Sequence, residues 1–330
     1  MKNILINLLL TCVCLSGQAQ VNLVKNPDFE KFTTCPDYLN QIVFCNFWSI
    51  PVDTISTKEY CAEYYNACGN STPDHGDDVP NNSYFYQNAH SGNGLAAAGF
   101  FYDKTAPPML PGIVPVNYRD YLQGRFRERP IAGKKYCVSF WINLAEASGY
   151  GHNKIGVYID NGSINISTDT PGTEILNVKP QVYTNDIIAD TANWIKIEGD
   201  FEAKGDETHI TIGVFVPNDS ITTILAHGHL TQYSYYLIDD VSVIPIDLKA
   251  DAGKDSHAEP GKPVQIGRVG DTTAMGLDCK WYYKGLLFDS GAIISVNGSA
   301  IVGTIDTYVV VQTICGLVKT DTVTVTTVPL

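Results

Sequence analysis

Acidic residues stand inside two apolar segments that lie far apart in the sequence. Glu30 closes the segment NLVKNPDFE, and Asp239 and Asp240 interrupt the apolar alternation of the segment YYLIDDVSVIP. An ionised carboxylate in a half-buried strand is costly unless its charge is compensated. A hard cation is the simplest compensation, because Ca²⁺ binds carboxylate and backbone oxygens together. These residues therefore predict a structural Ca²⁺ site, with two aspartates that merely end a strand in solvent as the alternative.

Aromatic side chains are the second group whose chemistry suits a ligand. The chain contains 19 Tyr and 12 Phe, and several of them gather between residues 47 and 86. Flat aromatic faces bind the apolar side of sugar rings, whereas aromatics at strand spacing more often belong to a core. We select Trp48, Tyr64, Tyr84 and Tyr86 as candidate ligand-binding residues and keep burial in the core as the competing interpretation.

The sequence contains no pattern that predicts a catalytic centre. A nucleophile elbow, an HExxH zinc pattern and a P-loop are all absent from it. A glycosidase needs only two facing carboxylates, so an enzyme stays open as an alternative in a chain with 35 acidic residues. The formal net charge of −13 argues against a nucleic-acid partner, which requires a basic surface to neutralise phosphate.

Strands have to position these residues, because apolar side chains recur at every second position along much of the chain. Residues 136–142, 155–159 and 210–216 follow this pattern, and turns rich in Gly, Pro, Asn and Asp separate them. Helical patterning is scarce. The sequence predicts an all-β chain in which pairing of residues 22–30 with residues 235–245 closes a sandwich and brings the acids together.

Composition divides the chain into segments. Residues 1–19 have the charged start, apolar core and small residues of a cleaved signal peptide, and the apolar run is too short to span a bilayer. Charge, Pro and Gly replace the strand pattern over residues 247–263, which we interpret as a linker and first-strand region. We predict one domain over residues 20–246, a smaller one over residues 264–330, and export to the medium or the outer cell surface.

Seven cysteines remain after removal of the predicted signal peptide, so an odd one is left over when the others pair. The close pairs Cys35/Cys45 and Cys61/Cys68 lie in loop-like sequence and are plausible local disulfides, and a Cys35–Cys68 linkage stays open. Cys137 lies inside a strongly alternating strand, where we expect a buried free thiol.

A series of motifs over about residues 21–246 resembles an N-terminal domain of secreted Bacteroidetes proteins. More broadly, it is similar to the galactose-binding-like jelly rolls that include many non-catalytic carbohydrate-binding modules. The resemblance implies that Asp240, which directly precedes an apolar residue of the last strand, is the metal ligand in preference to Asp239. The motifs that carry it are NLVKNPDFE, TTCPDYLNQ, EYYNACG, DVPNNSYFYQNAHSGNGLAAAGF, YRDYLQGRF, AGKKYCVSFWINLAEASGY and YYLIDDVSV.

The C-terminal part resembles an Ig-like or PKD-like sandwich through Trp281 in CKWYYKG and the late Cys315. This resemblance implies a Cys279–Cys315 disulfide. The expected architecture is a jelly-roll β-sandwich followed by a smaller Ig-like β-sandwich. The expected function is non-catalytic binding or adhesion to a polysaccharide or cell-surface partner. The alternatives are a glycoside hydrolase or lyase on the jelly roll, and a structural envelope component without a small ligand.

Overall fold

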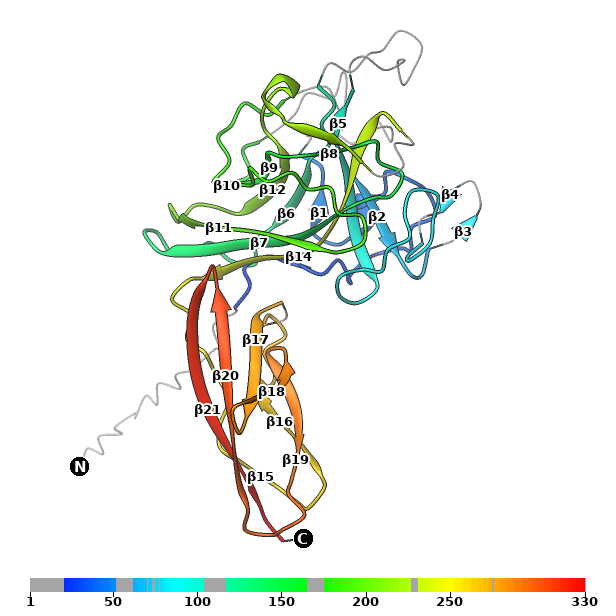
Figure 1. Cartoon of the computed structure of the whole chain (residues 1–330). Coiled ribbons are helices and arrows are strands. Elements are labelled where there is room, and N and C mark those ends of the chain that lie inside the picture. The colour runs from blue at the N-terminus through cyan, green and yellow to red at the C-terminus, as the bar shows by residue number, and fades with distance from the viewer. Residues whose placement is uncertain are drawn as a thin grey trace, which may run out of the picture.

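Strands dominate the computed structural model, and the all-β prediction is confirmed (Figure 1). Among the described residues, the helical elements are two short 3-10 turns, η1 (Ile42–Phe44) and η2 (Asn218–Ser220). None of the helices described there is long and apolar enough to cross a membrane. The structure describes residues 21–51, 62–69, 71–72, 75–76, 78–103, 117–164, 175–226, 231–274 and 276–329. The predicted signal peptide and Cys61 lie outside these ranges.

The first sandwich consists of two five-stranded antiparallel sheets. One sheet has the order β1 (Trp48–Ser49), β6 (Leu122–Arg125), β12 (His209–Val214), β9 (Ile155–Asp160), β10 (Val182–Tyr183). The other has the order β11 (Ile195–Glu202), β7 (Lys135–Leu144), β14 (Tyr233–Pro245), β5 (Gly94–Tyr102), β2 (Glu63–Asn66). Two small ribbons complete this part, β8 (Tyr150–His152) with β13 (Thr223–Leu225), and β3 (Ser71–Thr72) with β4 (His75–Gly76).

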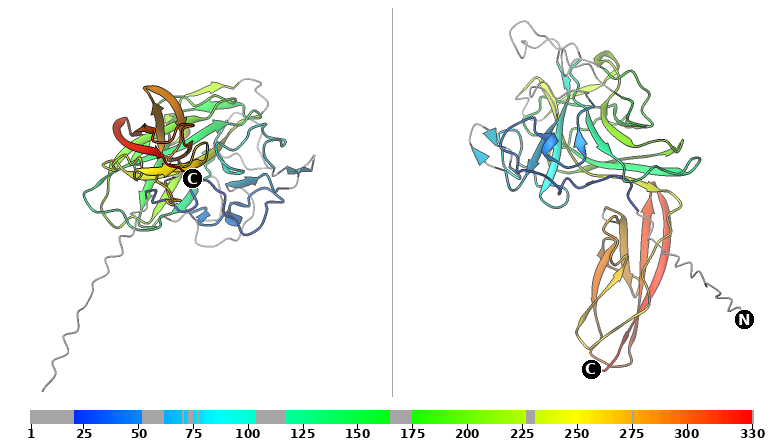
Figure 2. Two further views of the ribbon diagram at one scale, coloured as in Figure 1. Left: turned by 90° about the horizontal axis from the view of Figure 1, so that it is seen from below. Right: turned by 180° about the vertical axis from the view of Figure 1, so that it is seen from behind.

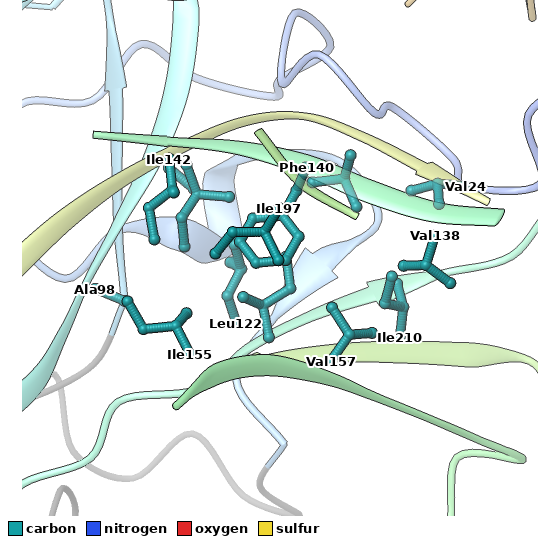
Figure 3. Packing of buried hydrophobic residues seen from close by; sticks show 14 of the residues in the cluster. Val24, Ala98, Leu122, Val138, Phe140, Ile142, Ile155, Val157, Ile197 and Ile210 are labelled. Atoms are coloured by element: carbon teal, nitrogen blue, oxygen red, sulfur yellow. The ribbon is translucent and has the colours of Figure 1, made fainter. Parts of the chain in front are cut away.

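The core of the first sandwich lies between these two sheets. Val138, Phe140 and Ile142 of β7 point toward Leu122 and Val157 of the facing sheet (Figure 3). All five side chains are fully buried. Because successive residues of a strand point to opposite faces, the period-two pattern of the sequence translates directly into this core.

The N-terminal segment runs across the edge of the sandwich without forming a regular strand. The backbone N–H of Leu23 donates to the carbonyl of Val243 at 3.0 Å, and Val24 forms an isolated bridge with Phe126. The segment therefore contacts β14 on one side and follows β6 on the other. The N-terminal segment therefore lies beside the end of β14, as predicted. Single hydrogen bonds join the two segments in place of a regular strand ladder.

The second sandwich is smaller and unequal in its two sheets. Five strands form one sheet in the order β15 (Ser256–Ala258), β21 (Leu317–Thr327), β20 (Ile305–Ile314), β17 (Asp278–Tyr283), β18 (Leu286–Ser290). In the described part of the chain, the other sheet consists of β16 (Pro263–Gly267) and β19 (Ile293–Asn297). Trp281 is completely buried in the core between them, next to inward-facing Val residues of β20 and β21.

A disulfide between Cys137 and Cys315 joins the two sandwiches, so the predicted Cys279–Cys315 pair and the free Cys137 are both wrong. Cys279 points into the second core, opposite Gln312 in the ladder, while Cys315 lies beyond the end of β20 in the hairpin turn. Cys137 is on the outward face of β7, and the tip of the β20–β21 hairpin meets that face (Figures 1 and 2). Sequence alternation located Cys137 in a strand but not its external partner.

The second disulfide is Cys35–Cys68, the linkage that the sequence left open. The expected pairs Cys35/Cys45 and Cys61/Cys68 are therefore both wrong, because each of them needs a cysteine that this bond already uses. Cys45 is a buried free thiol. The side-chain amide of Asn26 donates to its sulfur at 3.1 Å, and burial raises the pKa of this thiol well above its usual range. Cys45 therefore behaves as a small core residue.

Hydrogen bonds reinforce the junction between the sandwiches. The backbone N–H of Val21 donates to Thr273 Oγ1 at 2.7 Å, and Lys319 Nζ donates to the carbonyl oxygens of Ile246 and Leu248 at 2.7 and 2.9 Å. The predicted linker region also packs onto the second sandwich, because it contains β15 and the fully buried Ala252. The chain that connects the sandwiches is consequently short and held at both ends.

We expect limited proteolysis near Asp247 and Lys249 to give two fragments that separate only after reduction. The reason is that the Cys137–Cys315 disulfide joins the fragments even when the connecting chain is cut. Electrophoresis with and without reductant measures this directly. Separation without reductant would contradict the pairing, and the Cys137→Ser variant is the control that should separate under both conditions.

Candidate functional site

Glu30 holds the start of β5 and the loop before it. Its Oε1 atom accepts the backbone N–H groups of Asn93 and Gly94 at 2.6 and 2.7 Å. Gly92 has φ +63°, and a Cβ atom at this position would lie against the carboxylate of Glu30. The close approach of this loop, residues 90–94, to Glu30 thus requires glycine at position 92.

Asp239 and Asp240 hold the same 90–94 loop from the other side. Asp239 Oδ2 accepts the backbone N–H of Ser91 at 3.1 Å, and Asp240 Oδ1 accepts the hydroxyl of Ser91 at 2.7 Å. His90 Nδ1 lies 2.5 Å from Asp240 Oδ2. All three predicted acids therefore meet one loop, which the sequence analysis did not connect with them.

A bulge in β14 explains how two consecutive acids reach one loop. The register of β14 against β7 shifts between Asp239 and Ser242, and Asp240 has φ +48°. Neighbouring residues in a regular strand point to opposite faces, so this irregularity turns both carboxylates toward Ser91. The alternative that these aspartates merely end a strand in solvent is wrong, because Asp239 is completely buried within β14.

The electrostatics of Asp239 are unfavourable for an ion. Burial first and the neighbouring Asp240 carboxylate second raise the pKa of Asp239 well above its usual range, and Asp28 adds to this effect. Its hydrogen bonds with Ser91 and with its own neighbour's backbone N–H oppose the shift. Such a carboxylate is stabilised either by a proton or by a nearby cation.

Two of the four predicted aromatic residues cannot act as ligand platforms. Trp48 and Tyr64 are 3% and 1% exposed, and both belong to the first core. Trp48 Nε1 donates to the carbonyl of Asn26 at 2.7 Å, and the Tyr64 hydroxyl donates to the carbonyl of Phe29 at 2.9 Å. They brace the segment that carries Glu30, so the core interpretation is correct for both.

The other two candidates lie nearer the surface. Tyr84 packs its ring 5.6 Å from the ring of Tyr235 and is half-buried. Tyr86 is 67% exposed, and its backbone N–H donates to Glu146 Oε2 at 3.1 Å. Tyr86 is therefore the predicted aromatic residue whose ring is most available to a ligand.

A cleft that the sequence analysis did not predict opens between the edges of the two sheets. It has a volume of about 550 Å³ and lies between the chain that leads away from β10 and the edge strand β11. Residues 183–190 form one wall and residues 195–198 form the other. Volumes of this size suit a small ligand or a segment of a larger one.

Tyr183 supplies the aromatic surface at this cleft. Its side chain is 47% exposed, and Lys154 Nζ lies 5.1 Å from the centre of its ring. The same ammonium group donates to Asn185 Oδ1 at 2.5 Å. These two contacts of the ammonium group restrict the motion of the Lys154 and Tyr183 side chains.

Charged groups line the rest of the cleft. Lys196 Nζ lies 2.9 Å from Glu198 Oε2, and Asp190 Oδ1 accepts the backbone N–H groups of Ala192 and Asn193 at 2.8 Å each. Hydrogen bonds from Asn193 and then Ala192 lower the pKa of Asp190 below its usual range. The sequence offered only a weak signal for this site, a Tyr followed by Thr, Asn and Asp between apolar residues.

Comparisons with known proteins found matches among solved structures. No protein-family model matches the chain, and no curated protein matches it. The similar solved structures include carbohydrate-binding modules and adhesin domains. The K1 cleaved adhesin domain of Lys-gingipain from Porphyromonas gingivalis W83 is 14% identical with a TM-score of 0.31, and the match covers 66% of this chain and 95% of that domain.

Two further solved structures show the same range of similarity. The carbohydrate-binding module TmCBM61 in complex with β-1,4-galactotriose is 14% identical with a TM-score of 0.28, covering 68% of this chain and 98% of the module. The CBM22-1 xylan-binding domain of Xyn10C from Paenibacillus barcinonensis is 11% identical with a TM-score of 0.31, covering 67% of this chain and 92% of that domain.

We expect the buried Asp239 to destabilise the protein as the pH rises. The experiment uses chelator-treated protein, so that the Ca²⁺ predicted from the sequence does not compensate the carboxylate. Its folded-state pKa lies above its unfolded value, so its stabilising contribution is complete below about pH 4 and is lost as the pH rises toward the folded value. Thermal melts of the wild type and the Asp239→Asn variant, compared from pH 4 to pH 8, isolate this residue. The wild type should lose stability relative to the variant with rising pH, and a constant difference would contradict the assignment.

Proposed function

We propose that this chain is an exported, non-catalytic binding or adhesion protein that recognises a glycan at the cleft beside Tyr183. The observation that supports this proposal most directly is the composition of the cleft, which combines one half-exposed aromatic ring with amide, carboxylate and ammonium groups. Sugar rings present an apolar face and a rim of hydroxyl groups. Such a ligand uses an aromatic ring and planar hydrogen-bonding side chains together.

The charges at the cleft favour a glycan without acidic substituents. Three acids line the cleft, Asp186, Asp190 and Glu198. Two basic groups stand against them, Lys196 in the wall and Lys154 beside Tyr183, and Lys196 is already paired with Glu198. An additional carboxylate or sulfate on the ligand would be repelled by this excess of negative charge. The net charge of −13 acts in the same direction at longer range.

Asp190 at the cleft does not have the electrostatics of a glycosidase's general acid. A glycosidase holds its general acid protonated near neutral pH, which requires a raised pKa. Asp190 has a lowered pKa because three N–H donors stabilise its ionised form. Asp190 is therefore suited to accept hydrogen bonds from hydroxyl groups and unsuited to donate a proton.

We propose that the second sandwich is an Ig-like spacer that presents the first one. Two features support this proposal. The sheet order β15-β21-β20-β17-β18 opposite the pair β16-β19 resembles that of Ig-type sandwiches, and Trp281 is buried on the third strand of this sandwich. The Cys137–Cys315 disulfide and the bonds of Lys319 restrict rotation between the sandwiches. A restrained spacer would hold the cleft at a defined orientation on a cell surface.

We also propose a structural Ca²⁺ at Glu30, Asp239 and Asp240, in support of the first sandwich. The donors are all oxygens, and the raised pKa of Asp239 marks a buried carboxylate whose charge needs compensation. Within the described residues, these three carboxylates do not approach one another as closely as a shared metal requires. A bound cation would therefore draw them together and compete with His90 for Asp240. The role of the cation would be structural: its positive charge would compensate the buried carboxylates.

The cation proposal predicts that a chelator lowers the melting temperature of the protein by at least ~2 °C. The reason is that an ion which binds only the folded state stabilises it by mass action. Asp240→Asn should abolish the response, whereas Glu128→Gln, which removes an exposed acid elsewhere, should retain it. Differential scanning calorimetry with and without added Ca²⁺ provides the measurement. Identical melting curves after prolonged chelation would refute the site.

The glycan proposal predicts that replacement of Tyr183 by Ala weakens binding at least about fivefold, since stacking on an aromatic ring contributes on the order of 1 kcal/mol or more. A panel of neutral polysaccharides in affinity electrophoresis identifies a ligand, and calorimetry then compares the variants. Tyr86→Ala is the matched control, because Tyr86 is also exposed but lies outside the cleft. Loss of binding in the Tyr86 variant alone would place the ligand elsewhere, and release of reducing sugar would favour the enzyme alternative.

A further inference from the structure

The edge strand β18 of the second sandwich is exposed at all five residues, and its first three residues are apolar. It pairs with β17 on one side and forms the edge of its five-stranded sheet on the other. Leu286, Leu287 and Phe288 are 75%, 64% and 47% exposed. Soluble proteins usually protect such an edge with a bulge, Lys, Pro or a covering segment, because free backbone N–H and C=O groups there attract another strand. In β18 the register against β17 shifts at Phe288, and the strand itself contains neither Lys nor Pro.

The unequal sheets of the second sandwich explain this exposure. The facing sheet has only two strands, β16 and β19, and leaves β18 uncovered. Phe288 contacts the rings of Tyr283 and Tyr308 at centroid distances of 6.3 and 5.6 Å, so its own sheet buries it only in part. Both faces of the strand consequently present apolar surface beside an open backbone edge.

We propose that β18 pairs antiparallel with β18 of a second copy of this chain, around a two-fold axis at Leu287. In this register Leu287 lies opposite its own copy, and Leu286 lies opposite Phe288 of the other chain on both sides of the axis. The acid of the strand, Asp289, lies beyond Phe288 and near the turn residue Gly285 of the other chain. Apolar cross-strand pairs are favourable and no like charges oppose each other, so the strand is complementary to itself.

The distribution of charge permits this contact despite the acidity of the whole chain. Residues 247–330 carry nine acidic and seven basic residues, a net charge of −2, so residues 1–246 carry −11 of the total of −13. Two copies that meet through their second sandwiches bring together the nearly neutral parts. Long-range repulsion between the acidic first sandwiches is then screened by salt over about 8–10 Å.

The pairing makes a closed dimer, because a two-fold contact uses the same edge on both copies. Two five-stranded sheets would join into a continuous ten-stranded sheet. A strand of five residues buries little area, so the affinity belongs to the weak end of specific interfaces. Two copies on one surface would gain from this pairing because tethering raises their effective concentration.

Sedimentation equilibrium of the full mature chain, at concentrations on the order of 100 µM, tests the proposal. The wild type should contain a monomer–dimer equilibrium. Leu287→Lys should raise the dissociation constant at least about tenfold, because two lysines would face each other across the axis. Val318→Lys is the matched control: Val318 is 63% exposed in the same sandwich but lies on β21, and this variant should dimerise like the wild type.

Three outcomes would overturn the proposal. A wild type that stays monomeric at this concentration would leave the edge to a strand of a different protein. Dimerisation that survives Leu287→Lys and fails in Val318→Lys would place the interface on the β20–β21 hairpin. Assemblies larger than a dimer would mean that the copies associate head to tail, because a two-fold contact stops at two copies. Circular dichroism of each variant verifies that the fold is retained.

Discussion

The buried carboxylate of Asp239 is the constraint on which the closure of the first sandwich depends. It lies in the central region of a sheet, beside a second acid, where an uncompensated charge is costly. The backbone N–H of Ser91 and the contacts of Asp240 with His90 and Ser91 draw the loop of residues 90–94 over it. Glu30 holds the same loop from the N-terminal segment. The first and last parts of this sandwich are thereby connected through a third segment.

The second constraint is the register of β7, because the outward-facing residues of this strand make contacts on which other parts of the structure depend. The inward positions fill the core, and the outward positions serve other purposes: Cys137 bonds to the hairpin of the second sandwich, and Trp141 stacks on His90 at a centroid distance of 4.1 Å. One strand thus supports the core, the acid-bound loop and the junction between the sandwiches. Because these roles alternate along a single strand, a change in its register would disturb all of them.

The two sites proposed for recognition both lie at sheet edges. The cleft proposed to bind a glycan lies between the chain that leaves β10 and the strand β11, and the proposed dimer contact uses β18. Each of these three strands stands at the edge of its sheet. Edges are where a sandwich leaves side chains and backbone groups without a neighbouring strand. In the cleft those positions are polar and favour hydroxyl groups, whereas on β18 they are apolar and favour another strand.

Much of the fold followed from the sequence alone. Period-two patterning is a local property, so it predicted the all-β class and the core faces of β7, β9 and β12. The cost of burying a carboxylate likewise pointed to Glu30, Asp239 and Asp240 before any contact was known. These inferences needed only each residue and its close neighbours. The spacing of Cys35 and Cys68 left their pairing open.

Only the tertiary structure decided what depends on contacts between distant segments. The partner of Cys137 lies in the other sandwich, and the bulge that turns Asp240 toward Ser91 depends on the register between β14 and β7. Trp48 and Tyr64 were mistaken for a surface because burial is set by what packs over a residue, which local sequence does not specify. Tyr183 was missed for the same reason: the cleft exists only where two sheet edges come together.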